Sequence, residues 1–218
     1  ISHCSSICLS MITASSMLLN KEVNNCICNV SANNSSSEKQ YRNPTEYGTP
    51  KPPTSTFTAT GCASAILTKE KSNIKIESVT IGKAVDYGIK DVYNMGAAMA
   101  PSASYTISKH LEDLNRSPDY YDLIVTGDLG AYGKEIVKDY MLNHYSISLG
   151  ENYNDCGVML YDINTQKDVH AGGSGPVCNA LVSFGYIYQM ILKGKYKRVL
   201  VLATGALLNP VMTNQKLS

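Results

Sequence analysis

The sequence predicts an α/β fold built from two similar halves, with mixed, mostly parallel sheets. The first observation is an internal repeat, because residues 4–34 align without a gap against residues 178–208. Each copy has a small-residue turn, a long apolar segment of helical character, a short polar turn and a short strand. The second observation is that strand and helix patterns alternate along the chain, which favours helices packed on the faces of a sheet. A repeat this long exceeds solenoid periods and indicates a duplicated domain.

The first copy predicts a helix over residues 5–19 and a strand over residues 25–30. Small or apolar residues lie on nearly every face of the helix, so we expect it to be buried. Because side chains alternate along a strand, Cys26 and Cys28 should share one face. Residues 33–56 are rich in Ser, Asn, Pro, Gly and Thr, and proline interrupts regular structure. We interpret them as a loop that covers a functional site.

The region between the two copies alternates between strand and helix patterns. The predicted strands are residues 56–67 (broken at Gly61), 76–81, 123–126 and 158–162, and the predicted helices are residues 102–114 and 134–143. Residues 88–100 are rich in Gly, Ala and Met and predict a loop, with Pro101 at the permitted first turn of the next helix. His110 and His144 have polar neighbours in helical patterns, so both are expected to be solvated.

The second copy begins after a hairpin-like turn at residues 164–167. A glycine loop at residues 169–175 leads into a helix over residues 177–192 and a strand over residues 199–203. We therefore divide the chain into residues 1–68, the remainder of an N-terminal half that includes the covering loop at 33–56, and residues 69–218, the C-terminal half. The first helix lacks the strand expected before it, so we expect the N-terminal part of the first half to be missing.

Composition excludes several functional classes. A chain of 218 residues with 44% hydrophobic and 17% charged residues is globular. Its net charge of +1 gives no electrostatic basis for binding nucleic acid. The longest apolar run, residues 199–208, is too short to span a bilayer. The seven cysteines lie in helix and strand patterns, which favours a reducing, cytoplasmic compartment, and without zinc spacing we expect no metal and no cofactor.

Motifs spread over residues 41–210 resemble those of the thiolase and ketoacyl-synthase superfamily. They are YRNPTEYG (41–48), MGAAMAP (95–101), DLNR (113–116), YDLIVTGDL (121–129), NDCG (154–157), HAGGSG (170–175) and RVLVLATGALL (198–208). They occur in order and are collectively specific, whereas the first forty residues match less well. The resemblance implies a thiolase-like fold with duplicated αβαβα layers. It also implies an N-terminal strand–helix region that this chain lacks.

Within the superfamily, the chain most resembles a branch that acts in sporulation. That resemblance implies a non-catalytic protein that binds dipicolinic acid (pyridine-2,6-dicarboxylic acid), free or as its calcium salt, for uptake into the developing spore. It further implies partner proteins of the same transport system, some of them membrane-embedded, and a possible homodimer. The implied location is cytoplasmic, at the spore inner membrane or in the forespore. Two alternatives stay open, a thiolase-type or ketoacyl-synthase-type acyltransferase and a scaffold subunit of the transport complex.

Cys4 occupies the position of the superfamily's nucleophile, at the turn into a helix. A thiol there ionises more easily, and the free backbone N–H groups at the same place attract a carboxylate. Cys4 is therefore a candidate nucleophile or ligand contact, with a buried structural thiol as the alternative. His170 precedes a small-residue loop, as the superfamily's catalytic histidine does in His-Pro-x-Gly-x-Ser-Gly, but the proline is absent. It is a candidate base or ligand contact, or a packing histidine.

Asp128 follows the strand at residues 123–126, where superfamily enzymes carry a His or Asn that stabilises an oxyanion. A carboxylate has the wrong charge for that task, which argues against acyl transfer. Asp128 is expected to cap the following segment, or alternatively to hold calcium. The remaining candidate ligand contacts are Gly172, Gly173 and Ser174, through the loop backbone, and Tyr47, through ring stacking.

Arg42 and Lys51 in the covering loop are cations that pair with a dicarboxylate or are simply solvated. Together, these candidate residues predict a binding site for an anionic small molecule where the helix-start loops of the two repeats meet.

Overall fold

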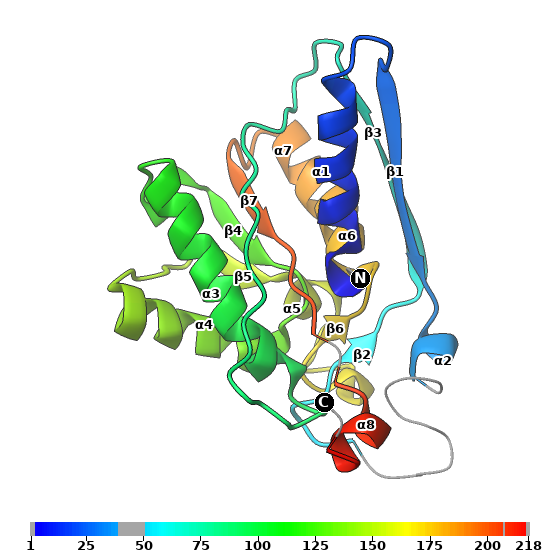
Figure 1. Cartoon of the computed structure of the whole chain (residues 1–218), viewed down its shortest axis with the longest axis vertical. Helices are drawn as coiled ribbons and strands as arrows, with labels where there is room; N and C mark the ends of the chain where they lie inside the picture. Colours follow the sequence, from blue (N-terminus) through cyan, green and yellow to red (C-terminus); the bar gives the residue numbers. More distant parts are fainter. Residues whose placement is uncertain (1–2, 39–50, 207, 217–218) are drawn as a thin grey trace.

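The computed structural model describes residues 3–38, 51–206 and 208–216 (Figure 1). Its strands form three small sheets. These are an antiparallel pair, β1 (Asn25–Ala32) with β3 (Gly61–Thr68); a parallel pair, β2 (Phe57–Thr58) with β6 (Gly173–Ser174); and a parallel sheet ordered β5 (Tyr153–Asp155), β4 (Leu123–Thr126), β7 (Val199–Leu202). The predicted α/β class is confirmed, and the thiolase-like layering stays a prediction.

The three-stranded sheet is covered by helices on both faces. On one face lie α3 (Met95–Asp113) and α4 (Gly130–Tyr145). On the other lies one continuous helix made of α6 (Cys178–Ala180), a π-helical segment (Leu181–Ile187) and α7 (Tyr188–Leu192). Leu123 and Val125 of β4 point into one core and Ile124 into the other, so the strand is buried on both faces. Its last residue, Thr126, is a buried polar residue.

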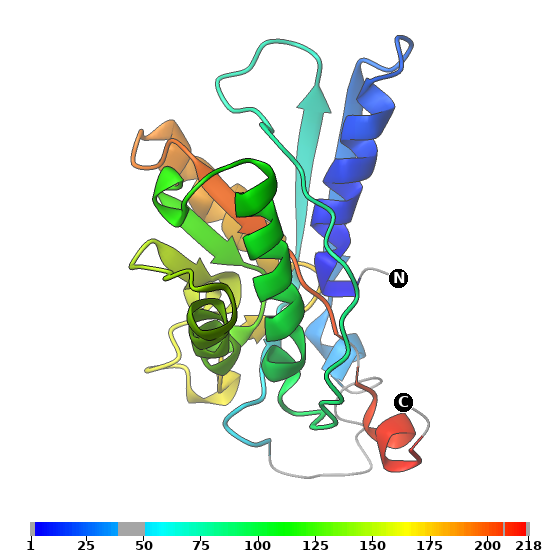
Figure 2. The same ribbon diagram turned by 60° about the vertical axis from the view of Figure 1, so that its left-hand side comes forward.

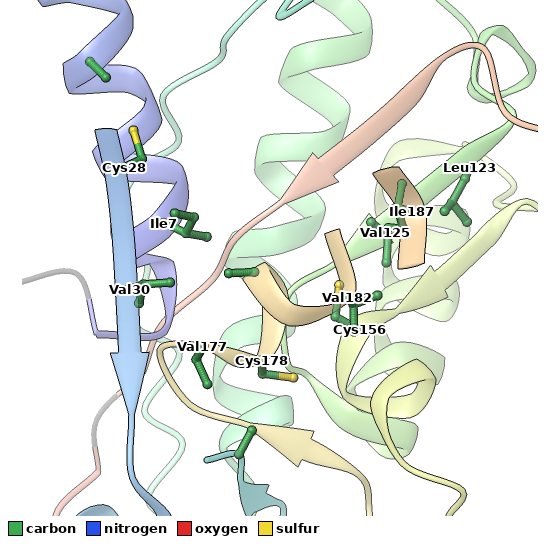
Figure 3. Close-up of a cluster of buried hydrophobic side chains, with 13 residues drawn as sticks. Ile7, Cys28, Val30, Leu123, Val125, Cys156, Val177, Cys178, Val182 and Ile187 are labelled. Atoms are coloured by element: carbon green, nitrogen blue, oxygen red, sulfur yellow. The ribbon is translucent and has the colours of Figure 1, made fainter. Parts of the chain in front are cut away.

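The helix α1 (Ser6–Leu18) packs beside the β1–β3 pair. The extended chain before α3 runs between α1 and α3, and α4 lies farther from α1 (Figure 2). Cys28 and Val30 point inward, and Figure 3 shows them in the core that Ile7 shares with Val177 and Cys178. Cys26 packs against the same core, so the predicted shared face of Cys26 and Cys28 is confirmed.

The faces of the β1–β3 pair and of α1 that point away from the core are exposed. Ile27 is 74% exposed and pairs across the ladder with Ile66, which is 69% exposed. On α1, Ile7 and Ala14 are buried, whereas Leu9 and Met17 are about half exposed. The expectation of a fully buried helix is therefore wrong for this chain, because α1 packs on the β1–β3 side and its other stripe faces outward.

The repeat found in the sequence recurs as the same order of elements. Each copy has a cysteine-bearing turn, a helix (α1, or α6 to α7) and a strand (β1 or β7). The two strands differ in partners, because β1 pairs antiparallel with β3, whereas β7 pairs parallel with β4. The elements between the two copies include β2, β3, an extended segment over residues 69–94, α3, β4, α4, β5, the short helix α5 (Cys156–Leu160) and β6.

The predicted strand at residues 76–81 is not formed. This segment runs beside α3 and is held by side chains, with Thr80 Oγ1 2.7 Å from His110 Nδ1 and Glu77 paired with Arg116. His110 is consequently buried, contrary to the expectation that it is solvated, and its Nε2 lies 2.7 Å from the hydroxyl of Tyr121. The other histidine expected to be solvated, His144, is exposed.

The helix α3 begins earlier than predicted, so Pro101 lies inside it and not in its first turn. Its start is fixed by Asn94, whose side chain accepts a hydrogen bond from the amide of Ala97 at 3.2 Å. The run of small residues that suggested a loop instead allows close helix packing. A Cβ on Gly96 would lie 2.3 Å from the carbonyl oxygen of Leu129, at the contact between α3 and α4.

The predicted strand at residues 158–162 is wrong as well, because residues up to Leu160 belong to α5. Asp155 ends β5 and caps α5 by accepting a hydrogen bond from the amide of Gly157. A short apolar run fits either a strand or a buried helix, and here the cap formed by Asp155 favours the helix.

The predicted covering loop contains a short helix, α2 (Asn34–Ser37), and its residues 39–50 lie outside the described residues. No helix in the described ranges is long and apolar enough to cross a membrane.

The close approach of α3 and α4 gives a testable stability prediction. A Cβ on Gly133 would lie 2.8 Å from the backbone of Gly96, so Gly133→Ala should lower the free energy of unfolding by about 1–3 kcal/mol. Gly185 lies in the 178–192 helix, and a Cβ added there would meet no atom within 4 Å, so Gly185→Ala should raise that free energy by up to about 1 kcal/mol. Urea unfolding of both variants tests the packing, and an unchanged or stabilised Gly133→Ala protein would contradict it.

Candidate functional site

A cavity of about 30 Å³ lies where the start of α1 meets the loop before α6 and the turn after β4. It brings together three of the residues predicted from the sequence, Cys4, Asp128 and Ser174. The end of α2 contributes Ser37 and the β2 strand contributes Thr58. The helix-start loops of the two repeats therefore border one shared pocket.

Cys4 lies in a short 3₁₀ turn, His3–Ser5, directly before α1, and is half-buried. Its repeat counterpart, Cys178, begins α6 and is fully buried. Burial raises the pKa of the Cys178 thiol, and the nearby Asp128 carboxylate raises it further. Burial also raises the pKa of Cys8, one turn beyond Cys4, to about 11. Of these three thiols, Cys4 is the one that lines the cavity.

Asp128 does not cap the following helix, as the sequence had suggested. Asp155 takes that role, because its carboxylate accepts hydrogen bonds from the amides of Leu129 and Gly130 at 2.9 and 3.0 Å. Asp128 is buried, and its Oδ2 accepts a hydrogen bond from the amide of Gly175 at 3.0 Å. It therefore joins the turn after β4 to the glycine loop and places a carboxylate at the cavity wall.

The glycine loop has mainly structural contacts outside the cavity. The carbonyl of Gly172 accepts a hydrogen bond from the amide of Phe57, and its own amide donates to the carbonyl of Val169. A Cβ on Gly172 would lie 2.7 Å from the carbonyl oxygen of Gly157, and one on Gly173 would lie 3.1 Å from Tyr161. These glycines let the loop approach β2 and α5 closely.

His170 has a left-handed backbone, with φ of +51°, and is half-buried. Neither His170 nor Gly172 nor Gly173 belongs to the lining of the cavity formed by the described residues. Their part in ligand binding stays a prediction. Tyr47 and Arg42 lie outside the described residues, and Lys51 forms an ion pair with Glu38 at 2.8 Å.

Sequence analysis did not identify the lining residues Ser37, Thr56, Thr58, Met95 and Met99 as site residues, nor the buried acid close to Asp128, Asp155. It is fully buried, and besides the two α4 amides it accepts hydrogen bonds from Thr126 Oγ1 at 2.7 Å and from the amide of Gly157 at 2.9 Å. Burial raises the pKa of Asp155 to about 7, and the nearby Asp128 adds to the rise, while the hydrogen-bond donors oppose it. The signal was an Asp directly before Cys156 and Gly157, because an Asp commonly caps a helix that begins at the next residue.

The cavity offers hydroxyl groups and methionine side chains next to one carboxylate. Thr56, Thr58 and Ser174 supply hydroxyls, and Met95 and Met99 of α3 supply adaptable apolar surface. Within the described ranges, no group of three or more His, Cys, Asp or Glu is arranged to hold a metal ion. Most of the surface that lines the cavity is apolar, so the arrangement suits a small molecule with an apolar body and few polar groups.

Comparison with known proteins decides the family. The sequence profile of the family described as Stage V sporulation protein AD (SpoVAD) matches residues 1–218. The chain belongs to the SpoVAD family. Stage V sporulation protein AD of Bacillus subtilis (strain 168) is 43% identical over 213 residues, which cover 98% of this chain and 62% of that protein. The chain therefore spans less than two thirds of this SpoVAD relative, and its family confirms the sporulation branch indicated by the sequence motifs.

Asp155 predicts a pH dependence of stability. Because its folded-state pKa of about 7 lies above the ordinary value of 3.8, the folded protein retains a proton that the unfolded chain loses in this range. The contribution of Asp155 to the free energy of unfolding should therefore fall as pH rises from about 4 to about 7. In Asp155→Asn this contribution is absent, so the difference in stability between wild type and variant should shrink across the window.

Urea unfolding of both proteins at several pH values measures this difference. His110 acts in the opposite direction, because burial lowers its pKa, but it is present in both proteins and cancels. Parallel stability curves for wild type and Asp155→Asn would show that Asp155 does not titrate in this window.

Proposed function

We propose that this SpoVAD family member is a non-catalytic binding module for dipicolinic acid that acts in its uptake into the developing spore. The observation that carries the proposal is the cavity between Cys4 of the first repeat and the Ser174–Gly175 loop that leads into the second. Membership in a family named for sporulation supports the biological setting. Its partners would be other proteins of the same transport system, some of them membrane-embedded. The protein would lie at the periphery of the spore inner membrane or in the forespore. It would also be able to form a homodimer.

In this proposal the ligand carboxylates receive hydrogen bonds from hydroxyls such as Thr58 and Ser174, and the ring packs against Met95 and Met99. The carboxylate of Asp128 repels a bare dianion at the same wall. A calcium ion carried by the ligand offsets this repulsion, because calcium takes carboxylate oxygens as ligands. The calcium salt is therefore the form that this pocket favours.

The cavity must enlarge for such a ligand to enter. A volume of about 30 Å³ holds no more than a few water molecules, and a pyridine dicarboxylate is several times larger. Met95 and Met99 are unbranched and flexible, so their displacement is the least costly route to a wider pocket. Binding is thus expected to rearrange the wall formed by α3.

An acyltransferase is the second candidate, because Cys4 lines the cavity. Two observations weigh against it. His170, the candidate base, does not belong to the described cavity lining, and Asp128 presents a carboxylate where an oxyanion would need donors. A pure scaffold role is the outcome if neither kind of ligand binds.

Replacing Cys4 tests the proposed site. Cys4→Ala should weaken dipicolinate binding about tenfold, with and without calcium, because it removes a polar contact at the start of α1 while the fold persists. Cys8→Ala is the matched control, since Cys8 lies one turn away outside the described lining. Isothermal titration calorimetry measures the affinity, and circular dichroism checks folding.

The same proteins separate the alternatives. Equal affinity in wild type and Cys4→Ala would remove Cys4 from the binding site. Covalent labelling of wild type by acyl-CoA, lost in Cys4→Ala, would favour the acyltransferase instead. Absence of dipicolinate binding by the wild-type chain would contradict the proposed function.

A further inference from the structure

The short helix α2 takes the place of a neighbouring strand along one edge of β2. On the other edge, the amides of Phe57 and Ala59 donate to Gly172 and Ser174 at 2.8 and 2.9 Å, which joins β2 to β6. The backbone groups of Thr58 point the opposite way. Its carbonyl accepts a hydrogen bond from Asn34 Nδ2 at 2.8 Å, and its amide donates to Glu38 Oε1 at 2.9 Å.

We infer that Asn34 and Glu38 are positioning residues that fix the pocket wall through the backbone of Thr58; the inference rests on the proposed function. The two side chains come from opposite ends of α2 and hold both polar backbone groups of one strand residue. A two-residue strand paired on one side alone is a weak element. Side-chain contacts from α2 supply the second edge.

A charge contact fixes the orientation of Glu38. Its side chain is buried, and its other oxygen, Oε2, lies 2.8 Å from Lys51 Nζ. A buried carboxylate is stable when it is paired and hydrogen-bonded, and both conditions are met here. Lys51 also lies 6.0 Å from the centre of the Phe57 ring, directly before Thr58. Lys51 thus directs one carboxylate oxygen of Glu38 toward the Thr58 amide.

The position of Thr58 affects the pocket through two sets of contacts. Thr58 lines the cavity and pairs in register with Ser174, which lines it too. Its methyl group also packs against Gly175, where an added Cβ would lie 2.8 Å away, and the Gly175 amide holds Asp128. A shift of β2 therefore displaces Ser174, Gly175 and Asp128 together.

The test compares Glu38→Ala with Glu38→Gln, which keeps an oxygen acceptor for the Thr58 amide. Glu112→Ala is the matched control, because Glu112 forms an exposed ion pair with Lys109 on α3. Two quantities are measured at a temperature where every variant is folded. They are the dissociation constant for dipicolinate by calorimetry and the hydrogen-exchange rate of the Thr58 amide by NMR.

Glu38→Ala should raise the dissociation constant about tenfold and accelerate Thr58 exchange, the loss expected for one hydrogen bond to a charged group. Glu38→Gln keeps the oxygen acceptor but loses the ion pair with Lys51, so it should restore both quantities in part, and Glu112→Ala should change neither. A merely stabilising role for Glu38 would leave the affinity of the folded protein unchanged, so an unchanged dissociation constant overturns the inference. Should Glu38→Ala not fold, Asn34→Ala removes the other contact and is held to the same criteria.

Failure of the proposed function is recognised separately. If the wild-type chain binds no dipicolinate, the proposed function fails, and Thr58 exchange alone then decides whether α2 positions the wall. Unchanged Thr58 exchange in both Glu38→Ala and Asn34→Ala overturns the positioning role in that case as well.

Discussion

The buried carboxylate of Asp155 is the constraint on which the site depends. It accepts hydrogen bonds from Thr126 at the end of β4, from the first amides of α4, and from Gly157 at the start of α5. One side chain thus satisfies donors that two helix starts would otherwise leave unpaired in the interior. The turn that it shapes carries Asp128, which in turn holds the amide of Gly175. The position of the pocket wall therefore depends on two buried acidic residues, Asp155 and Asp128.

The repeat explains why a pocket forms at this place. Each copy begins with a tight turn that leads into a helix, and the two turns approach each other, so that Cys4 faces the loop of Ser174 and Gly175. Helix starts present backbone donors, and such a meeting point suits anions. Here one of those donors, the Gly175 amide, already serves Asp128. Under the proposed function, a ligand that brings its own positive charge is therefore expected to bind better than a bare dicarboxylate.

The sequence allowed correct prediction of the features that depend on local pattern. The strand Leu123–Thr126 has apolar residues on both faces and was placed correctly, and the repeat placed Cys4 near Ser174. Features set by single side chains or by distant partners could not be predicted. Gly96 suggested a loop until α4 was seen to pack against it, and the cap supplied by Asp155 turned a predicted strand into α5. Short-range pattern carries no information about either contact.

The most direct test of the account is a crystal structure of the protein with dipicolinate and calcium. The account predicts ligand density between Cys4 and the Ser174–Gly175 loop, with the side chains of Met95 and Met99 displaced and calcium beside Asp128. Density at a different surface, for example in the groove beside Tyr186 and Tyr196, with the cavity between the two helix starts unchanged, would contradict it.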